Sequence, residues 1–123
     1  MNIHKLLLVF AGSATGGTLR YLISGWIQHH NSTKIPIGTF SVNILGCFIL
    51  GMLLESFLKT DNPDQLKLLL VTGFCGGFTT FSAFSFENLE LIKNGSYWMA
   101  LLYIVISVIL GVLATLAGMI VLK

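Results

Sequence analysis

The sequence reads GFCGGFTTFSAFSFE between residues 73 and 87, in the middle of an otherwise apolar segment. This stretch holds three glycines, four hydroxyl side chains and five phenylalanines, where a segment that only crosses a membrane would use leucine and valine. Three glycines within five residues favour a break in a helix. Irregular backbone at membrane depth is tolerated only inside protein or beside a water-filled cavity. The stretch therefore predicts a helix broken near Gly76-Gly77, whose freed carbonyls are of the kind that coordinate Na⁺ in transporters.

The composition places the chain in a membrane. Of its 123 residues, 54% are hydrophobic and only 10% are charged, whereas soluble domains carry about 25% charged residues. The mean hydropathy is +0.85. Because a helical span needs roughly 20 mostly apolar residues, four spans with short loops occupy residues 1–123 as a single transmembrane domain. The expected fold class is thus an all-α membrane protein, with spans at residues 5–27, 36–58, 66–92 and 97–122.

Lysine and arginine are distributed almost evenly between the two ends of this predicted bundle. The end with both termini and the second loop carries four lysines. The other end carries two lysines, and Arg20 is nearer to that end. These lysines are Lys5, Lys59, Lys67 and Lys123 at the first end, and Lys34 and Lys93 at the second. Orientation in a bilayer follows the excess of Lys and Arg in short loops. The weak excess therefore predicts insertion in both orientations, and with it an antiparallel homodimer about a two-fold axis in the membrane plane.

Polar side chains within the spans are the candidates for an ion path. Arg20 lies roughly two turns from the end of the first span, where a charge must snorkel to the interface, pair, or face water. Asn43 shares a helix face with Thr39 and Gly46. Its amide either hydrogen-bonds a neighbouring helix or lines an ion path. In the fourth span a stripe of small and hydroxyl residues at helical spacing is first interpreted as a close-packing face; it consists of Tyr103, Ser107, Gly111, Ala114 and Gly118.

The two phenylalanines Phe81 and Phe84 lie three residues apart, on one helix face. Aromatic residues at this spacing are usually plain packing. However, these two alternate with hydroxyl residues such as Thr80 and Ser82, and the edge of a phenyl ring is electropositive. Ring edges beside hydroxyls can face a small anion without binding it tightly, which is the compromise that conduction needs.

No enzyme signature appears, and no nucleic-acid partner is expected. The sequence has no nucleophile elbow, phosphate-binding loop or cluster of metal-ligating side chains. Cys47 and Cys75 lie in separate apolar segments and are interpreted as small packing residues. Glu87 and Glu90 fall near the end of the third span, where a solvated carboxylate is the default.

Three motifs carry a resemblance to a known family. Residues 16–21 read GGTLRY and are similar to a glycine-x-x-arginine-tyrosine motif, and residues 38–46 read GTFSVNILG and are similar to a Gly-Thr-x-x-x-Asn-x-x-Gly pattern. Residues 73–84, GFCGGFTTFSAF, are close to the most distinctive run of the same family. Over its full length the chain resembles the CrcB/Fluc family of fluoride channels.

The resemblance implies a concrete function and site. Members are antiparallel, dual-topology homodimers of the bacterial plasma (inner) membrane that export toxic fluoride passively from the cytoplasm through two pores. A structural Na⁺ is implied at the dimer centre, on the backbone carbonyls of Gly76 and Thr79. Ala83 departs from the pattern, because many members carry a hydroxyl residue there. The implied fluoride pathway is Asn43, Thr80, Phe81, Ser82, Phe84, Tyr103, Ser107 and Thr115, with Arg20 in the vestibule.

Two other functions fit the size and the four spans. A small dual-topology multidrug exporter should carry a carboxylate in the first span, which this chain lacks, and Glu87 is the one candidate left for that role. A non-transport subunit would use the small-residue faces only to dock a larger partner. Proton-coupled transport of a cationic dye would favour the exporter, and ion flux through a stable homodimer would exclude the docking subunit.

Overall fold

The computed structural model describes all residues, Met1–Lys123, and consists of helices joined by short loops. Four helical spans are long and apolar enough to cross a membrane. The all-α, four-span prediction is therefore confirmed. The first, second and fourth spans are single helices: α1 (Ile3–His29), α2 (Ile37–Leu58) and α6 (Tyr97–Val121). The third span comprises four consecutive segments: α3 (Asp64–Leu66), η1 (Lys67–Cys75), α4 (Gly76–Phe78) and α5 (Phe81–Lys93).

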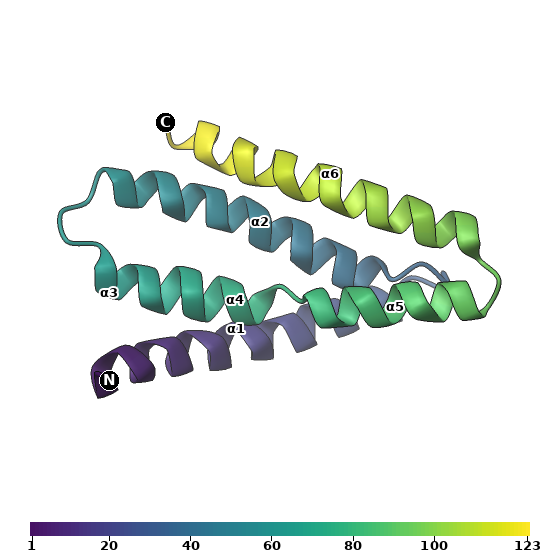
Figure 1. Ribbon diagram of the computed structural model, residues 1–123, viewed down its shortest axis with the longest axis horizontal. Helices are drawn as coiled ribbons and strands as arrows, with labels where there is room; N and C mark the ends of the chain where they lie inside the picture. The colour runs from purple at the N-terminus through teal and green to yellow at the C-terminus, as the bar shows by residue number, and fades with distance from the viewer.

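The spans form an elongated bundle in which both termini and the loop between α2 and α3 lie at one end (Figure 1). In Figure 1, α1 and the third span run away from that end, and α2 and α6 return to it. The loops before α2 and before α6 lie at the opposite end. This arrangement agrees with the predicted assignment of the lysines to the two ends.

Glycines bring α1 against the third span. A methyl group at Gly12 would collide with the Leu69 carbonyl oxygen, and one at Gly16 would collide with the carbonyl oxygen of Phe74. The Gly12-x-x-x-Gly16 motif is thus a point of close helix approach, as small residues four apart are in membrane proteins.

The helices α2 and α6 pack in the same way. A methyl group at Gly51 would meet the carbonyl oxygen of Thr115, and one at Gly118 would meet that of Phe48. Gly118 is buried, so the stripe on the fourth span serves as a packing face at this end.

The first half of the third span is wound more widely than expected. Lys67–Cys75 forms a π-helix, a winding that is rare and usually limited to a single turn at functional sites. At its end, the ring of Phe74 in η1 stacks on the ring of Phe78 in α4, with their centroids 5.6 Å apart. The sequence pattern predicts a helix here but gives no sign of its pitch.

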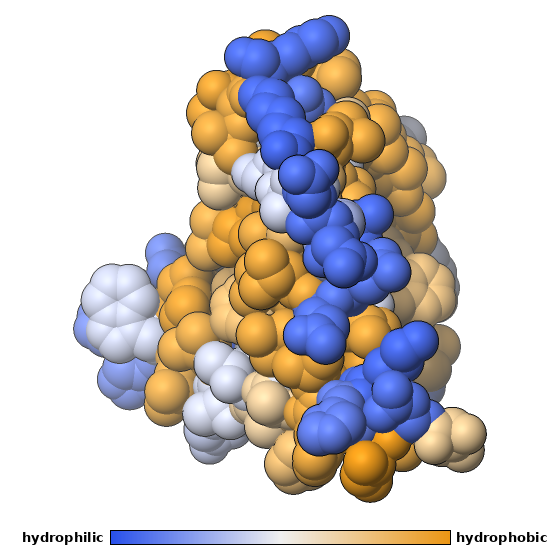
Figure 2. All heavy atoms as spheres, turned by 90° about the vertical axis from the view of Figure 1, so that its left-hand side faces the viewer, coloured by the Kyte–Doolittle hydropathy of each residue, from blue (hydrophilic) through white to orange (hydrophobic).

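The outer surface suits a bilayer. Only 17 of 123 residues are buried, and α6 exposes most of its large apolar side chains, such as Leu101 and Val112. Figure 2 looks at the end of the bundle that carries the termini, and hydrophilic atoms run across that end while hydrophobic atoms surround them. A polar end with an apolar circumference is the pattern of a membrane-spanning bundle.

Candidate functional site

The break in the third span lies at Thr79 and Thr80, three residues beyond Gly76. Gly76 keeps helical angles (φ −62°, ψ −36°), whereas Thr79 (φ −90°, ψ 157°) and Thr80 (φ −147°, ψ 113°) are extended. The predicted break is confirmed, but the threonines form it, and Gly76-Gly77 stays helical. Gly77 instead permits close packing, because a methyl group there would lie 2.6 Å from the Ser13 carbonyl oxygen.

Side-chain hydroxyls close the two helix ends at the break. The backbone N–H and the hydroxyl of Thr79 both donate to the carbonyl oxygen of Cys75, at 3.0 and 2.9 Å. The Thr80 hydroxyl oxygen accepts from the N–H of Ala83 at 3.1 Å, which is an N-cap for α5. The hydroxyl oxygens of Thr80 and Ser82 are also 3.2 Å apart.

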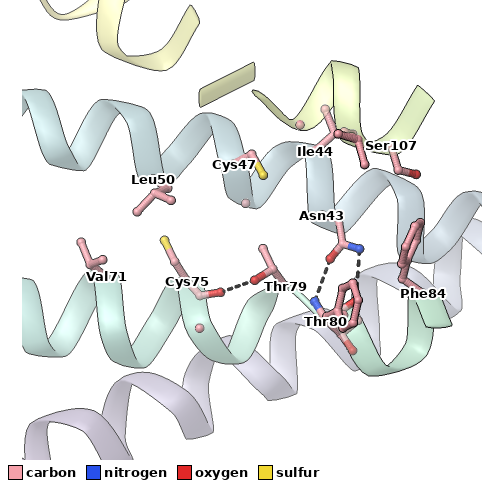
Figure 3. A pocket seen from close by; sticks show the side chains of 15 residues that line it. Asn43, Ile44, Cys47, Leu50, Val71, Cys75, Thr79, Thr80, Phe84 and Ser107 are labelled. Atoms are coloured by element: carbon pink, nitrogen blue, oxygen red, sulfur yellow. Dashed lines mark hydrogen bonds between the residues drawn. The ribbon is translucent and has the colours of Figure 1, made fainter. Parts of the chain in front are cut away.

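Asn43 on α2 clamps Thr80 from across the bundle. The Thr80 N–H donates to Asn43 Oδ1 at 2.7 Å, and Asn43 Nδ2 donates to the Thr80 carbonyl oxygen at 3.2 Å. Figure 3 shows these two hydrogen bonds side by side. An asparagine amide has two N–H donors, so one donor remains for another partner. Of the two interpretations of Asn43, the structure shows the hydrogen bond to a neighbouring helix.

Arg20 holds the other side of the break. Its Nε donates to the Gly77 carbonyl oxygen at 3.0 Å, so the side chain is half-buried and pairs with backbone rather than extending freely to the interface. The two clamps, Arg20 at Gly77 and Asn43 at Thr80, lie on either side of Thr79.

The two phenylalanines face different surroundings. Their ring centroids are 5.8 Å apart with planes tilted by 38°. Phe81 is 79% exposed, whereas Phe84 is half-buried and meets the Tyr103 ring edge-on at 5.1 Å. Phe84 therefore belongs to the interior of this bundle, and Phe81 lies on its outside.

A cavity of about 430 Å³ opens beside the break and contains many of the predicted pathway residues. Its lining includes Asn43, Thr80, Phe81, Phe84 and Ser107, together with Gly76 and Thr79. In Figure 3 Asn43 and Ser107 lie on neighbouring helices above the break. The Ser107 hydroxyl oxygen is buried and has no hydrogen-bond partner.

Four predicted residues lie outside this lining. Arg20 binds Gly77, and Ser82 is exposed next to Thr80. Tyr103 is buried in the core beside Phe84, and the Thr115 hydroxyl donates to the carbonyl oxygen of Gly111 within its own helix.

Glu87 is a site residue that the pattern did not reveal. Its carboxylate is half-buried, accepts a hydrogen bond from Thr39 at Oε1, and accepts one from the Tyr103 hydroxyl at Oε2 over 2.8 Å. The expectation that the Glu87 carboxylate is solvated is therefore wrong. Glu87 follows Phe84 by three residues and Thr39 shares a face with Asn43, but the sequence does not show that these two helix faces meet.

The fold and the site define a small multi-pass membrane protein whose third span is broken beside a cavity lined by amide, hydroxyl and aromatic groups. Residues 7–119 match the family described as CrcB-like protein, Camphor Resistance (CrcB), and the chain belongs to this family.

Named relatives match nearly the whole chain. A protein of Phocaeicola vulgatus is 45% identical over 116 residues, which are 94% of this chain and 96% of its own. Proteins of Gloeothece citriformis and Sulfurovum sp. are each 42% identical and cover 97% and 100% of this chain, and 97% of their own length in both cases. All three are named fluoride-specific ion channel FluC. This name describes a channel, which agrees with the prediction that this chain is not an enzyme.

Proposed function

We propose that this chain is a fluoride channel that releases fluoride passively across the membrane and so relieves its toxicity. The observation that carries the proposal is the convergence of Asn43, Phe84 and Ser107 on one cavity beside the break, in a chain whose near full-length relatives bear the name of a fluoride-specific channel.

The chemistry of the cavity suits a small anion. Fluoride holds its water strongly, so a pore must offer several donors in its place. Asn43 keeps one free N–H, and the buried Ser107 hydroxyl has no partner. A buried group without a partner is rare in proteins and calls for a missing water or ion. The positive edges of Phe81 and Phe84 add weak attraction without a fixed charge, which favours release.

A second, antiparallel copy completes the site in this proposal, giving two pores per dimer. The exposed hydroxyl of Ser82 lies in mid-span beside the break, where lipid offers a polar group no partner. Phe81 projects outward from the same face. Covering this face with protein would bury these groups, and the weak charge bias permits the inverted partner.

The backbone around the break also fits Na⁺. Gly76 and Thr79 line the cavity, and no group of three or more His, Cys, Asp or Glu side chains offers an alternative metal site. Carbonyl oxygen is the donor type that hard cations prefer. Bound at a two-fold axis, the ion would supply positive charge that draws the two breaks together.

The proposal is tested by fluoride efflux from proteoliposomes, followed with a fluoride electrode. We expect rapid release of fluoride and little release of chloride. Phe81→Ile and Phe84→Ile keep apolar bulk but lose the ring edge, and each should lower fluoride flux. Equal permeation of chloride, or unchanged flux in both variants, would contradict the proposal. Loss of fluoride current when choline replaces sodium would support the Na⁺ site, and the mass of the purified particle tests the dimer.

A further inference from the structure

A second cavity, of about 360 Å³, opens at the end of the bundle opposite the termini. Its lining is polar apart from Pro36 and Leu91, and it includes one ammonium group, from Lys34, and two carboxylates, from Glu87 and Glu90. Asn94 and Ser96 from the loop before α6 complete its polar wall.

This second cavity is joined to the break by a short series of side chains. Phe84 lines the cavity at the break and meets the ring of Tyr103 at 5.1 Å. The Tyr103 hydroxyl donates to Glu87 at 2.8 Å, and Glu87 lines the second cavity. The series leads from the break to the surface at Lys34 and Glu90.

The two carboxylates at this opening differ in their surroundings. Glu87 receives hydrogen bonds from Thr39 and Tyr103, one on each oxygen. Glu90 is exposed, and neither of these two side chains donates to its carboxylate. Two negative groups at the mouth of a narrow path repel an anion, because clefts with one sign of charge enrich ions of the opposite sign.

The backbone that carries Lys34 is held in place by hydrogen bonds within its own loop. The Gln28 side-chain amide donates to the carbonyl oxygens of Thr33 and Ile35 at 3.4 and 3.3 Å, and its oxygen accepts from the Gly38 N–H at 3.1 Å. Lys34 lies between those two carbonyls, so the backbone that carries it is fixed between α1 and α2.

We propose that this cavity is a mouth of the fluoride path and that Lys34 is the residue that lets it admit an anion, by opposing the charges of Glu87 and Glu90. The inference rests on the proposed fluoride channel. It assigns Lys34 an electrostatic role at the entrance and no role in the narrow part of the path.

The test is single-channel fluoride current in planar bilayers, at fixed fluoride and with an impermeant salt added to vary ionic strength. At low ionic strength, Lys34→Gln should lower the current by about 2- to 5-fold, the effect of one unit charge across a water-filled opening. At about 1 M salt the Debye length falls to roughly 3 Å, and the difference should vanish. Lys34→Arg should keep the wild-type current, which separates lost charge from faulty folding.

Two further variants sharpen the test. Glu90→Gln should raise the low-salt current, and Lys34→Gln combined with Glu90→Gln should return it towards wild type. Lys93→Gln is the matched control, because Lys93 is an exposed lysine at the same end that does not line the cavity.

The outcomes separate this inference from the proposed function. A wild-type protein that passes no fluoride overturns the proposed function and the inference with it. A conducting wild type in which Lys34→Gln behaves like Lys93→Gln, or in which its deficit persists at high salt, overturns the role of Lys34 alone.

Discussion

Replacing Asn43 with alanine should release the backbone of Thr80 from its clamp. The substitution removes the acceptor 2.7 Å from the Thr80 N–H and the donor 3.2 Å from the Thr80 carbonyl oxygen. Each group left without a partner in a half-buried position costs about 1–3 kcal/mol. The free energy that protects the Thr80 amide from opening should fall by this amount, which corresponds to roughly 5- to 150-fold faster hydrogen exchange, since 1.4 kcal/mol is tenfold.

The assay is amide hydrogen exchange of the purified protein, read at Thr80 by NMR. Asn43→Asp is the informative second variant. Its carboxylate keeps an acceptor for the Thr80 N–H, so protection of this amide should stay near the wild-type value. The same carboxylate loses the donor to the Thr80 carbonyl oxygen and places negative charge in the cavity, so fluoride current should fall steeply.

The two variants thus separate the clamp from the pore. Fast exchange at Thr80 with Asn43→Ala, and slow exchange without current with Asn43→Asp, are the joint expectation. Unchanged exchange at Thr80 in Asn43→Ala would refute the reasoning, because the structure gives that amide no other acceptor.

Three further predictions follow from the packing. Gly77→Ala should lower the free energy of unfolding by about 1–3 kcal/mol, because the added methyl group overpacks against Ser13. The measurement is the melting temperature in detergent, which should fall. Gly25→Ala is the control and should leave the melting temperature unchanged, because no atom lies within 4 Å of the added methyl group. Tyr103→Phe should cost about 1.5–3 kcal/mol by the same measurement, because Glu87 loses a charge-assisted bond, and the exposed Tyr97→Phe serves as its control. In single-cysteine variants a maleimide should label half-buried Cys47 faster than buried Cys75, and equal rates would contradict the burial of Cys75.

The sequence pattern predicted the number of spans and the existence of the break, because both depend on composition over many residues. It placed the break near Gly76-Gly77, because glycine was taken as the residue that interrupts a helix, and the extended residues Thr79 and Thr80 lie shortly after that pair. Here Gly77 is held helical by close packing on α1, and the extended conformation falls to Thr79 and Thr80, whose hydroxyls can cap the helix ends on both sides. In this chain the threonines after the glycine pair mark the exact position of the break.

The candidate site was predictable only where residues lie close in sequence or match the family motifs. Asn43, Phe84 and Ser107 do converge on one cavity, while Thr115 does not reach it. Glu87 was missed because its partners lie 48 and 16 residues away, on two other helices. No local pattern encodes such a pairing, since it depends on how α2, α5 and α6 pack.

The clamps on either side of the break suggest why the proposed site for Na⁺ needs no carboxylate. Arg20 takes up the carbonyl oxygen of Gly77, and Asn43 takes up that of Thr80. Thr79 lies between these two hydrogen-bonded carbonyls, so side chains from α1 and α2 hold the backbone on both sides of it without an ion. Preorganised dipoles bind a cation without the cost of reorganising. The same arrangement leaves the cavity free of fixed negative charge, which an anion path beside a cation requires.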